Sequence, residues 1–139
     1  MPTVKKDVSI DAAAEEVWRI AGDPGQIADW LPPIESSRVE GDRRFCTLAD
    51  GGGQIEERIL EHSDEERRYR YEILDGPMPL SSYVSTFEVA DYGEHAHVTW
   101  TADFEPQEAS QEQELVEMFE EIYNGGLDAL KQKAEQNGG

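Results

Sequence analysis

The sequence lacks several features that would assign a location or a chemistry. It contains one cysteine, Cys46, so no disulfide can form within the chain, and this scarcity fits a reducing compartment. No run of about 18 apolar residues is present, which argues against a transmembrane helix. Residues 1–10 include lysines but no apolar stretch, so we expect no signal peptide. Together these absences predict a cytoplasmic protein.

Basic residues are also scarce, and the chain is strongly acidic. It holds 12 Lys and Arg residues, only four of them lysines, against 31 Asp and Glu residues, for a net charge of −19 at pH 7. Such a charge repels phosphate backbones and anionic membrane surfaces, which argues against nucleic acid as a partner and against stable membrane insertion. The composition is typical of a salt-rich cytoplasm and equally of an ordinary acidic protein from a GC-rich genome, and both interpretations stay open.

Motifs for common cofactors and nucleophiles are missing as well. The glycines at 51–53 precede a strand rather than a helix, so they predict a flexible hairpin tip or a lid, not a phosphate loop. His95 and His97 form a His-x-His pair, but no later histidine follows to complete a metal site, and we expect the pair to face outward. Cys46 has no neighbouring base and reads as an inert thiol. We therefore expect no metal and no cofactor.

The hydrophobic pattern of the 139 residues predicts one α+β domain over residues 1–139. Two short helices are expected after the first strand, over residues 12–21 and 24–31, with Asp11 and Asp23 as their N-caps. Short connections favour antiparallel pairing of consecutive strands. Alternating apolar residues predict seven strands, over residues 4–10, 34–40, 43–49, 54–61, 67–74, 83–89 and 98–104.

The last segment is predicted to be one long amphipathic helix. Apolar residues recur at steps of three and four from Leu115 to Leu130, and Ser110 with Gln113 forms a capping box. This helix must bury its apolar stripe, and the sheet must bury one face. We therefore expect a curved seven-stranded antiparallel sheet wrapped around the C-terminal helix, with a cavity between the two.

The predicted last helix has two weak points. The pair Gly125-Gly126 interrupts its interior, which favours tight packing on the sheet over a hinge or a close approach by a ligand. The final residues, 135–139, are polar and glycine-rich, so we expect a frayed tail there.

Several motifs, in this order, carry a resemblance to a known superfamily. The order strand, two short helices, six strands and long helix resembles the helix-grip fold of the SRPBCC, or START-like, superfamily. That group includes START lipid-transfer domains, the birch pollen allergen, plant abscisic-acid receptors and bacterial polyketide cyclase/dehydrase-like proteins, and the chain looks most like small members of the last class. The likeness is carried by residues 10–18 (IDAAAEEVW), by Asp23-Pro24 with Ile27, Trp30, Pro32 and Ile34, by residues 71–73, 76–79 and 83–86, by residues 98–100 and by the final helix.

The resemblance implies an apolar cavity under the long helix that holds lipids, polyketides or other aromatic compounds. Compared with the abscisic-acid receptors, Glu57-Arg58 looks like the cavity-side pair of a glutamate and an arginine. Glu35 falls where those receptors carry a ligand-anchoring lysine, and this inverted charge argues against an acidic ligand anchored there. Residues 50–53 and 77–80 resemble the receptors' gate and latch in position but retain neither motif, so hormone sensing is not carried over.

Glu57 and Glu35 are the candidate cavity carboxylates, and Glu57 is the candidate catalytic residue. A carboxylate in an apolar cavity is desolvated, which raises a carboxyl pKa toward neutrality and suits general acid–base chemistry. The alternation of Ile55, Glu57 and Ile59 favours the inner face, and a solvent-facing position beside Glu56 is the alternative. Tyrosines there can stack on a ligand ring and donate a hydrogen bond. The other predicted cavity residues are Trp30, Ile55, Tyr69, Tyr71, Leu80, Tyr83, Ser85, Trp100, Met118, Phe119, Ile122 and Tyr123.

Three functions fit this pattern. The first is the binding or transport of a small hydrophobic or aromatic molecule, with affinity from burial and orientation from one or two polar groups. The second is a metal-free polyketide cyclase or dehydratase, in which Glu57 moves protons and a tyrosine holds the enolate. The third is a protein-interaction module of the same fold. We favour binding, because no familiar acid–base constellation appears in the sequence.

Overall fold

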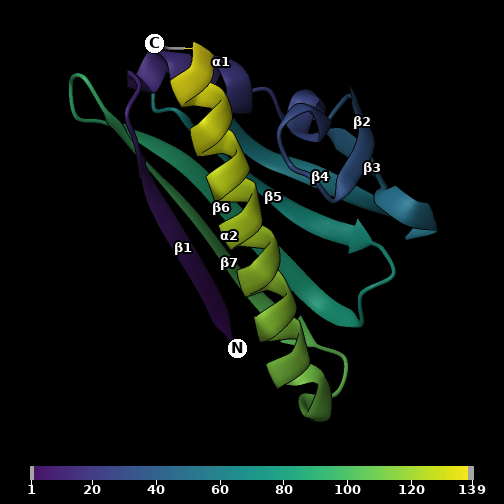
Figure 1. Ribbon diagram of the computed structural model, residues 1–139. Coiled ribbons are helices and arrows are strands. Elements are labelled where there is room, and N and C mark those ends of the chain that lie inside the picture. Colours follow the sequence, from purple (N-terminus) through teal and green to yellow (C-terminus); the bar gives the residue numbers. More distant parts are fainter. Residues whose placement is uncertain (1, 138–139) are drawn as a thin grey trace.

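The predicted strands form one curved antiparallel sheet in a computed structural model that describes residues 2–137 (Figure 1). Within these residues the strand order is β1-β7-β6-β5-β4-β3-β2, so every strand except β1 lies beside its neighbour in sequence. Register shifts in the β2–β3, β4–β5 and β6–β7 pairs bend the sheet toward its concave face. The strands are β1 (Thr3–Ile10), β2 (Ile34–Glu40), β3 (Arg43–Leu48), β4 (Gln54–Ser63), β5 (Arg68–Asp75), β6 (Leu80–Asp91) and β7 (Ala96–Pro106).

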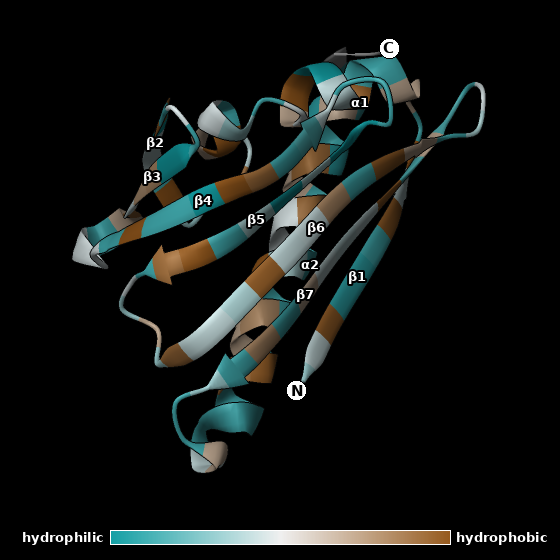
Figure 2. Cartoon of the chain, turned by 180° about the vertical axis from the view of Figure 1, so that it is seen from behind, coloured by the Kyte–Doolittle hydropathy of each residue, from teal (hydrophilic) through white to brown (hydrophobic). Residues whose placement is uncertain are grey.

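The alternation read from the sequence places the two faces of the sheet correctly. Figure 2 shows hydrophilic and hydrophobic residues alternating along the strands. In β7 the buried side chains recur at every second position from Ala96 to Pro106. The strands β6 and β7 extend beyond their predicted ends, because their outer residues still pair with each other, as between Leu80 and Pro106. The concave face thus holds the apolar core.

Two short helical segments close one end of the sheet. Helix α1 covers Ala14–Ala21 and buries Val17 and Ala21. Its N-cap is Ala13, without a side-chain hydrogen bond, so the prediction of Asp11 as the cap is wrong: the helix begins two residues later than the cap requires. The second segment, η1 (Pro24–Asp29), is a 3₁₀-helix and ends earlier than predicted. Its predicted cap is confirmed, since the Asp23 side chain accepts a hydrogen bond from the Gly25 amide at 2.9 Å.

The long C-terminal helix begins differently from the prediction. A 3₁₀ turn, η3 (Ala109–Gln111), precedes α2 (Glu112–Asn137). The capping box is formed by Glu108 and Gln111, and the Gln111 side chain accepts from the Glu108 amide at 3.2 Å. The predicted box of Ser110 and Gln113 is therefore wrong, because Ser110 already lies inside the preceding turn. A glutamate takes the cap position that the sequence pattern assigns to serine.

Helix α2 crosses the concave face and packs against β1, β7 and α1 (Figure 1). The Lys6 Nζ atom lies 3.4 Å from Glu120 Oε2, and Lys131 Nζ donates to the Ser9 carbonyl at 3.2 Å, so polar contacts join β1 to the helix at two points. Among the described residues, no helix is long and apolar enough to cross a membrane. The buried residues of the helix are Leu115, Phe119, Tyr123, Gly126, Leu127, Leu130 and Ala134.

The two glycines of α2 have different surroundings. A Cβ atom on Gly126 would lie 2.4 Å from Leu31 Cδ1 and 3.3 Å from Trp100 Cζ3, whereas a Cβ on Gly125 would meet nothing within 4 Å. The tight-packing interpretation therefore holds for Gly126, and the helix continues unbroken to Asn137. Residues 138 and 139 of the expected frayed tail lie outside the described residues, and fraying of 135–137 stays a prediction.

Candidate functional site

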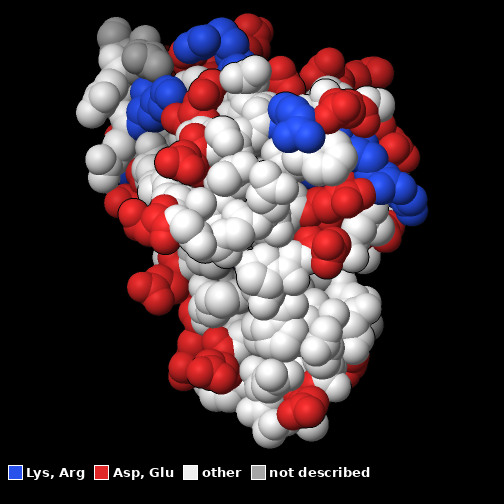
Figure 3. All heavy atoms as spheres, turned by 90° about the vertical axis from the view of Figure 1, so that its right-hand side faces the viewer, with Lys and Arg blue, Asp and Glu red and all other residues white. Residues whose placement is uncertain are grey.

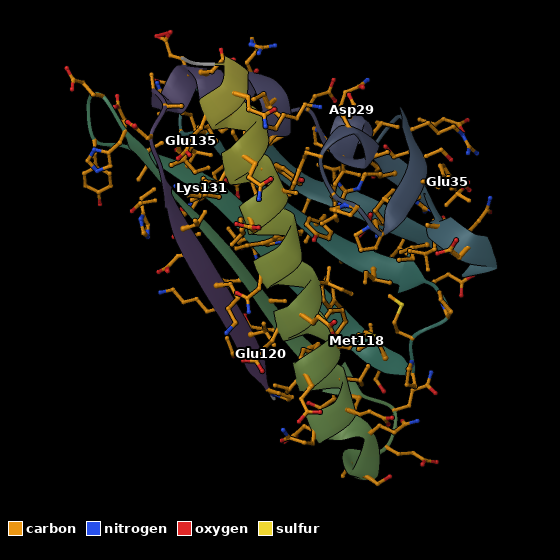
Figure 4. The ribbon with its side chains drawn as sticks, in the orientation of Figure 1. Asp29, Glu35, Met118, Glu120, Lys131 and Glu135 are labelled. Atoms are coloured by element: carbon orange, nitrogen blue, oxygen red, sulfur yellow. The ribbon has the colours of Figure 1, made fainter. Side chains whose placement is uncertain are left out.

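A cavity of about 530 Å³ lies between the sheet and the first half of α2, residues 112–123. It exists because α2 packs along β1 and β7, while the sheet curls away from the helix on the β3–β5 side. Figure 4 labels Met118, which lies on the side of α2 toward β4 and β5. Most of the lining is apolar or aromatic: Ile27, Leu31, Pro33, Ile34, Cys46, Leu48, Ala49, Ile55, Tyr71, Ile73, Pro77, Met78, Pro79, Tyr83, Trp100, Met118, Phe119, Ile122 and Tyr123.

The mouth of the cavity lies between two turns. One is the 3₁₀ turn η2 (Ala49–Gly51), which contributes exposed Asp50, and the other is the loop 76–79 before β6. The segment that follows η2 lies close to this loop, since a Cβ on Gly53 would lie 3.9 Å from Pro77 Cγ. Figure 3 views this side of the molecule, and its lower part is mainly free of charged residues, with acidic residues at the margin. An apolar molecule can therefore approach the mouth without desolvating many charges.

One ion pair lies inside the cavity wall. Arg44 on β3 and Glu57 on β4 are direct cross-strand partners, and their residues are 0% and 5% exposed. Arg44 Nε donates to Glu57 Oε1 at 2.7 Å. Arg44 Nη1 donates to the Pro24 carbonyl at 3.1 Å and to Tyr69 Oη at 3.3 Å, and the guanidinium carbon lies 4.5 Å from the centre of the Tyr71 ring.

The charges of this pair depend on each other. Burial, the largest single effect, disfavours the charged guanidinium, but the attraction of Glu57 together with smaller contributions from Tyr69, Tyr71 and Cys46 outweighs it and raises the pKa of Arg44 well above its ordinary value. Glu57 lies on the cavity wall, as the alternation of Ile55, Glu57 and Ile59 predicts, and its partner there is Arg44. Glu57 accepts hydrogen bonds through Oε1 from Arg44 Nε and from Cys46 Sγ.

Cys46 lies next to the ion pair on the same face of β3. Its Sγ atom is 3.5 Å from Glu57 Oε1, and the side chain is buried. Burial, aided by the negative charge of Glu57, raises the pKa of the thiol from 9.0 to about 12. The group is thus a protonated thiol at neutral pH, as expected for an inert cysteine.

A second, uncharged polar cluster lies where β5, β6 and β7 meet α2. The Tyr83 and Tyr123 hydroxyls are hydrogen-bonded to each other. Ser85 Oγ lies 3.3 Å from Tyr123 Oη and donates to the Thr101 carbonyl at 2.9 Å, while Trp100 Nε1 donates to Ser85 Oγ at 3.0 Å. The Trp100 and Tyr123 rings stack with centroids 4.0 Å apart. Burial raises the pKa of the Tyr83 hydroxyl, so this cluster is neutral and bonded within itself.

Most of the predicted cavity residues lie on the cavity wall. Three others are buried one layer behind it. Trp30 packs on Trp100 at 5.5 Å between ring centroids, Tyr69 accepts from Arg44, and Ser85 supports Trp100. These residues shape the wall without lining it. The predicted residues that line the cavity are Ile55, Glu57, Tyr71, Tyr83, Trp100, Met118, Phe119, Ile122 and Tyr123.

Three sequence predictions at the site need correction. Glu35 is exposed and points away from α2, because its neighbour Ile34 takes the inward position and lines the cavity (Figure 4). Leu80 is half-buried outside the lining, since the preceding loop, residues 77–79, closes that part of the wall. Arg58 does not pair with Glu57 but faces outward, where its Nε atom lies 3.6 Å from Asp42 Oδ2.

Arg44 is the charged residue of the cavity wall that the sequence does not predict. In the segment Arg43-Arg44-Phe45, hydrophobicity alone favours burial of the phenylalanine. Phe45 nevertheless faces outward, where the Arg38 guanidinium carbon lies 4.5 Å from the centre of its ring. The alternation of side chains along β3 indicates that Arg44 faces inward, because Arg44 shares a face with Cys46 and Leu48. In the hairpin register, Arg44 then falls opposite Glu57. Oppositely charged residues at paired inward positions indicate a buried ion pair.

Neither histidine of the pair lines the cavity. His97 faces outward and lies near Ser9 and Asp7, with Nδ1 3.1 Å from Ser9 Oγ and Nε2 3.4 Å from Asp7 Oδ2. His95 is exposed and stacks on Tyr92. Within residues 2–137, no group of three or more His, Cys, Asp or Glu side chains is placed to hold a metal ion.

The sequence was compared with known protein families and with curated proteins. The sequence profile of a family described as polyketide cyclase / dehydrase and lipid transport matches residues 1–135. Among curated proteins, none matches the sequence.

Solved structures share the whole fold. The protein XoxI from Bacillus cereus is 35% identical over 96% of this chain and 95% of its own, with a TM-score of 0.89. An uncharacterized protein from Bacillus thuringiensis is 31% identical over 96% of this chain and 98% of its own, also with a TM-score of 0.89. The di-domain ARO/CYC protein BexL of the BE-7585A biosynthetic pathway is 20% identical, over 97% of this chain and 47% of its own, with a TM-score of 0.83. The likeness to BexL is one of fold.

Proposed function

The chain belongs to the polyketide cyclase/dehydrase and lipid transport family, and on this premise we propose that it binds a small, largely apolar aromatic molecule between the sheet and α2. One observation carries the proposal: the cavity is lined mainly by apolar and aromatic side chains and contains a single buried ion pair. Its volume of about 530 Å³ falls in the range of small-molecule sites. Aromatic walls with a few polar groups give affinity through burial and orientation through hydrogen bonds.

The wall suits flat rings in particular. Tyr83 and Phe119 lie with ring centroids 5.0 Å apart, and Tyr71 lies 6.1 Å from Tyr83, so three rings form one side of the cavity. An aromatic ligand gains offset or edge-to-face contacts there beyond simple area burial. Met118 and Ile122 are half-buried and adapt the helix side to ligand shape.

A thermal-shift screen tests the proposal with fatty acids, a sterol, flavonoids and aromatic polyketides. A ligand present at about 100 times its dissociation constant adds roughly 2.7 kcal/mol to the free energy of unfolding. The substitution Ile122→Trp fills the cavity and is expected to abolish the shift, whereas Glu121→Trp, on the exposed side of the same turn, preserves it. An absence of any shift, or equal shifts in both variants, contradicts the proposal.

A second candidate function is supported by the position of Glu57. It is a buried carboxylate on the cavity wall, and the hydrogen bonds that it accepts from described residues reach Oε1 only. The other oxygen can accept a proton from a ligand carbon beside a carbonyl, as a cyclisation or dehydration requires. The test is turnover of a bound polyketide: Glu57→Gln is expected to bind the compound and leave it unchanged. Equal turnover in the variant removes Glu57 from the mechanism.

The setting of the protein is part of the proposal. We place it in the cytoplasm, which the protonated, unpaired Cys46 thiol supports. We treat residues 1–139 as one domain, because the strands share one sheet and the buried side chains form one cluster. The charge of −19 argues against nucleic acid as a partner.

A further inference from the structure

The buried ion pair leaves one donor without a partner. Arg44 is fully enclosed and lines the cavity, and its Nε and Nη1 atoms donate to Glu57, Pro24 and Tyr69. Among the described residues, Arg44 Nη2 has no hydrogen-bond partner. A buried charged donor without an acceptor is costly, so a group that accepts from Nη2 gains more than an ordinary surface contact.

The partner carboxylate offers the complementary group. Glu57 accepts from Arg44 Nε and from Cys46 Sγ through Oε1, and no hydrogen bond from the described residues reaches Oε2. Because Arg44 and Glu57 are direct cross-strand partners on the same inward face, their unused atoms belong to one patch of the wall. This patch therefore presents a hydrogen-bond donor and an acceptor together.

The net charge of the lining sets the charge of the ligand. The positive charge of Arg44 is balanced by Glu57, and the remaining charged residue of the lining is Asp50 at the mouth. An anion in this cavity would lose its hydration without meeting net positive charge. The second polar cluster gives no compensation, because its tyrosine, serine and tryptophan groups already bond one another.

We propose that the cavity selects neutral aromatic molecules that carry a hydrogen-bond acceptor and a hydrogen-bond donor side by side. The ligand's acceptor receives a hydrogen bond from Arg44 Nη2, and the ligand's donor gives one to Glu57 Oε2. Aromatic primary amides and hydroxy ketones belong to this class. The inference rests on the proposed function, because it names the ligand class of the same cavity. It is carried by the buried, unpartnered guanidinium nitrogen and by the balanced charge beside it.

Three probes of one shape test the selection by calorimetric titration of the unmodified protein at neutral pH. They are 2-naphthamide, which has both groups, 2-methylnaphthalene, which has neither, and 2-naphthoate, which is an anion. We expect the amide to bind about tenfold more tightly than the hydrocarbon, the effect of hydrogen bonds to charged partners. The anion is expected to bind weakest, by about tenfold or more relative to the amide.

A pair of charge-matched variants locates the effect. Glu57→Gln removes the negative charge beside Arg44, so the guanidinium then favours the anion and the ranking of 2-naphthoate and 2-naphthamide reverses. Glu35→Gln removes the same charge at an exposed position outside the lining and is expected to leave the ranking unchanged. The comparison of three probes in the unmodified protein stands even where Glu57→Gln fails to fold.

The outcomes separate the two proposals. If the amide and the hydrocarbon bind equally, or the anion binds as tightly as the amide, the inference is overturned while the apolar ligand site stands. If Glu57→Gln folds and keeps the original ranking, the assignment to the ion pair is also overturned. If none of the probes binds and the thermal-shift screen is negative as well, the proposed function itself fails.

Discussion

The two halves of α2 cover different parts of the sheet and differ in how completely they are packed. In the second half, residues 124–137, Leu127, Leu130 and Ala134 are buried, and Lys131 points toward β1 (Figure 4). In the first half, residues 112–123, Met118 and Ile122 are only half-buried and face the cavity. One helix thus closes the core along half its length and roofs the cavity along the other. We therefore expect the second half to contribute more to stability and the first half to contribute to the proposed ligand binding.

Breaking the ion pair in the cavity wall is expected to have the largest effect on stability. Arg44→Met leaves the Glu57 carboxylate buried without its partner, and we expect the free energy of unfolding to fall by about 3–5 kcal/mol. The double variant Arg44→Met/Glu57→Leu removes both charges and is expected to recover most of that loss. Urea denaturation measures both variants. A single variant as stable as the unmodified protein contradicts the assignment of a tightly coupled pair.

Truncation of one side chain in each half of α2 compares the halves directly. Leu130→Ala creates a void in a closed core and is expected to cost about 2–5 kcal/mol. Ile122→Ala enlarges a cavity that already exists and removes a half-buried side chain, so about 1 kcal/mol is expected. Equal losses in thermal or urea unfolding would remove the distinction between the halves.

Replacing each of the two adjacent glycines of α2 by alanine is expected to change the stability by smaller amounts and in opposite directions. Gly126→Ala places a Cβ 2.4 Å from Leu31 Cδ1 and is expected to destabilise the protein by about 1–3 kcal/mol. Gly125→Ala meets no atom and replaces a poor helix former, so it is expected to stabilise by up to about 1 kcal/mol. Melting temperatures of the two variants should move in opposite directions, and a shift in the same direction refutes the packing argument.

Alkaline pH is expected to lower the stability of the protein through buried groups of the sheet near the cavity. Burial raises the pKa of Cys46 from 9.0 to about 12 and that of Tyr69 from 10.0 to about 12. Above pH 9 the unfolded chain releases protons that the folded chain keeps, so stability is full below pH 9 and falls as pH rises toward 12. The expected slope is at most about 1.4 kcal/mol per pH unit for each group. Urea midpoints of the unmodified protein and Cys46→Ala measure it, and identical slopes contradict the burial of the thiol.

The sequence predicts most of this architecture because the spacing of apolar residues indicates which side chains are buried. Alternation in β7 and the steps of three and four from Leu115 to Leu130 each reflect one repeating geometry, and these elements appear where expected. The cavity residues on α2, such as Met118 and Ile122, follow from the same period. The space under the helix follows from a curved sheet wrapped around it, and the resemblance to the START-like superfamily implies the same cavity.

The misses arise where burial and polarity conflict. Arg44 is charged and fully buried, so a hydrophobicity pattern assigns its face to Phe45 instead. Glu35 came from positional likeness to a receptor lysine, although the alternation with Ile34 already pointed it outward. Trp30 shows a different limit. A side chain that is predicted to point inward can line the cavity or lie in the layer behind the lining. Which of the two it does depends on how strongly the sheet bends, and the sequence pattern does not give this curvature.

The most direct test of the account is methyl NMR of α2 during titration with 2-naphthamide. We predict chemical-shift changes at the Met118 and Ile122 methyl groups, which face the cavity, and none of comparable size at Leu130 and Ala134, which lie in the closed half. Changes confined to Leu130 and Ala134, or to exposed methyl groups such as those of Leu60, would contradict a ligand site beneath the first half of the helix.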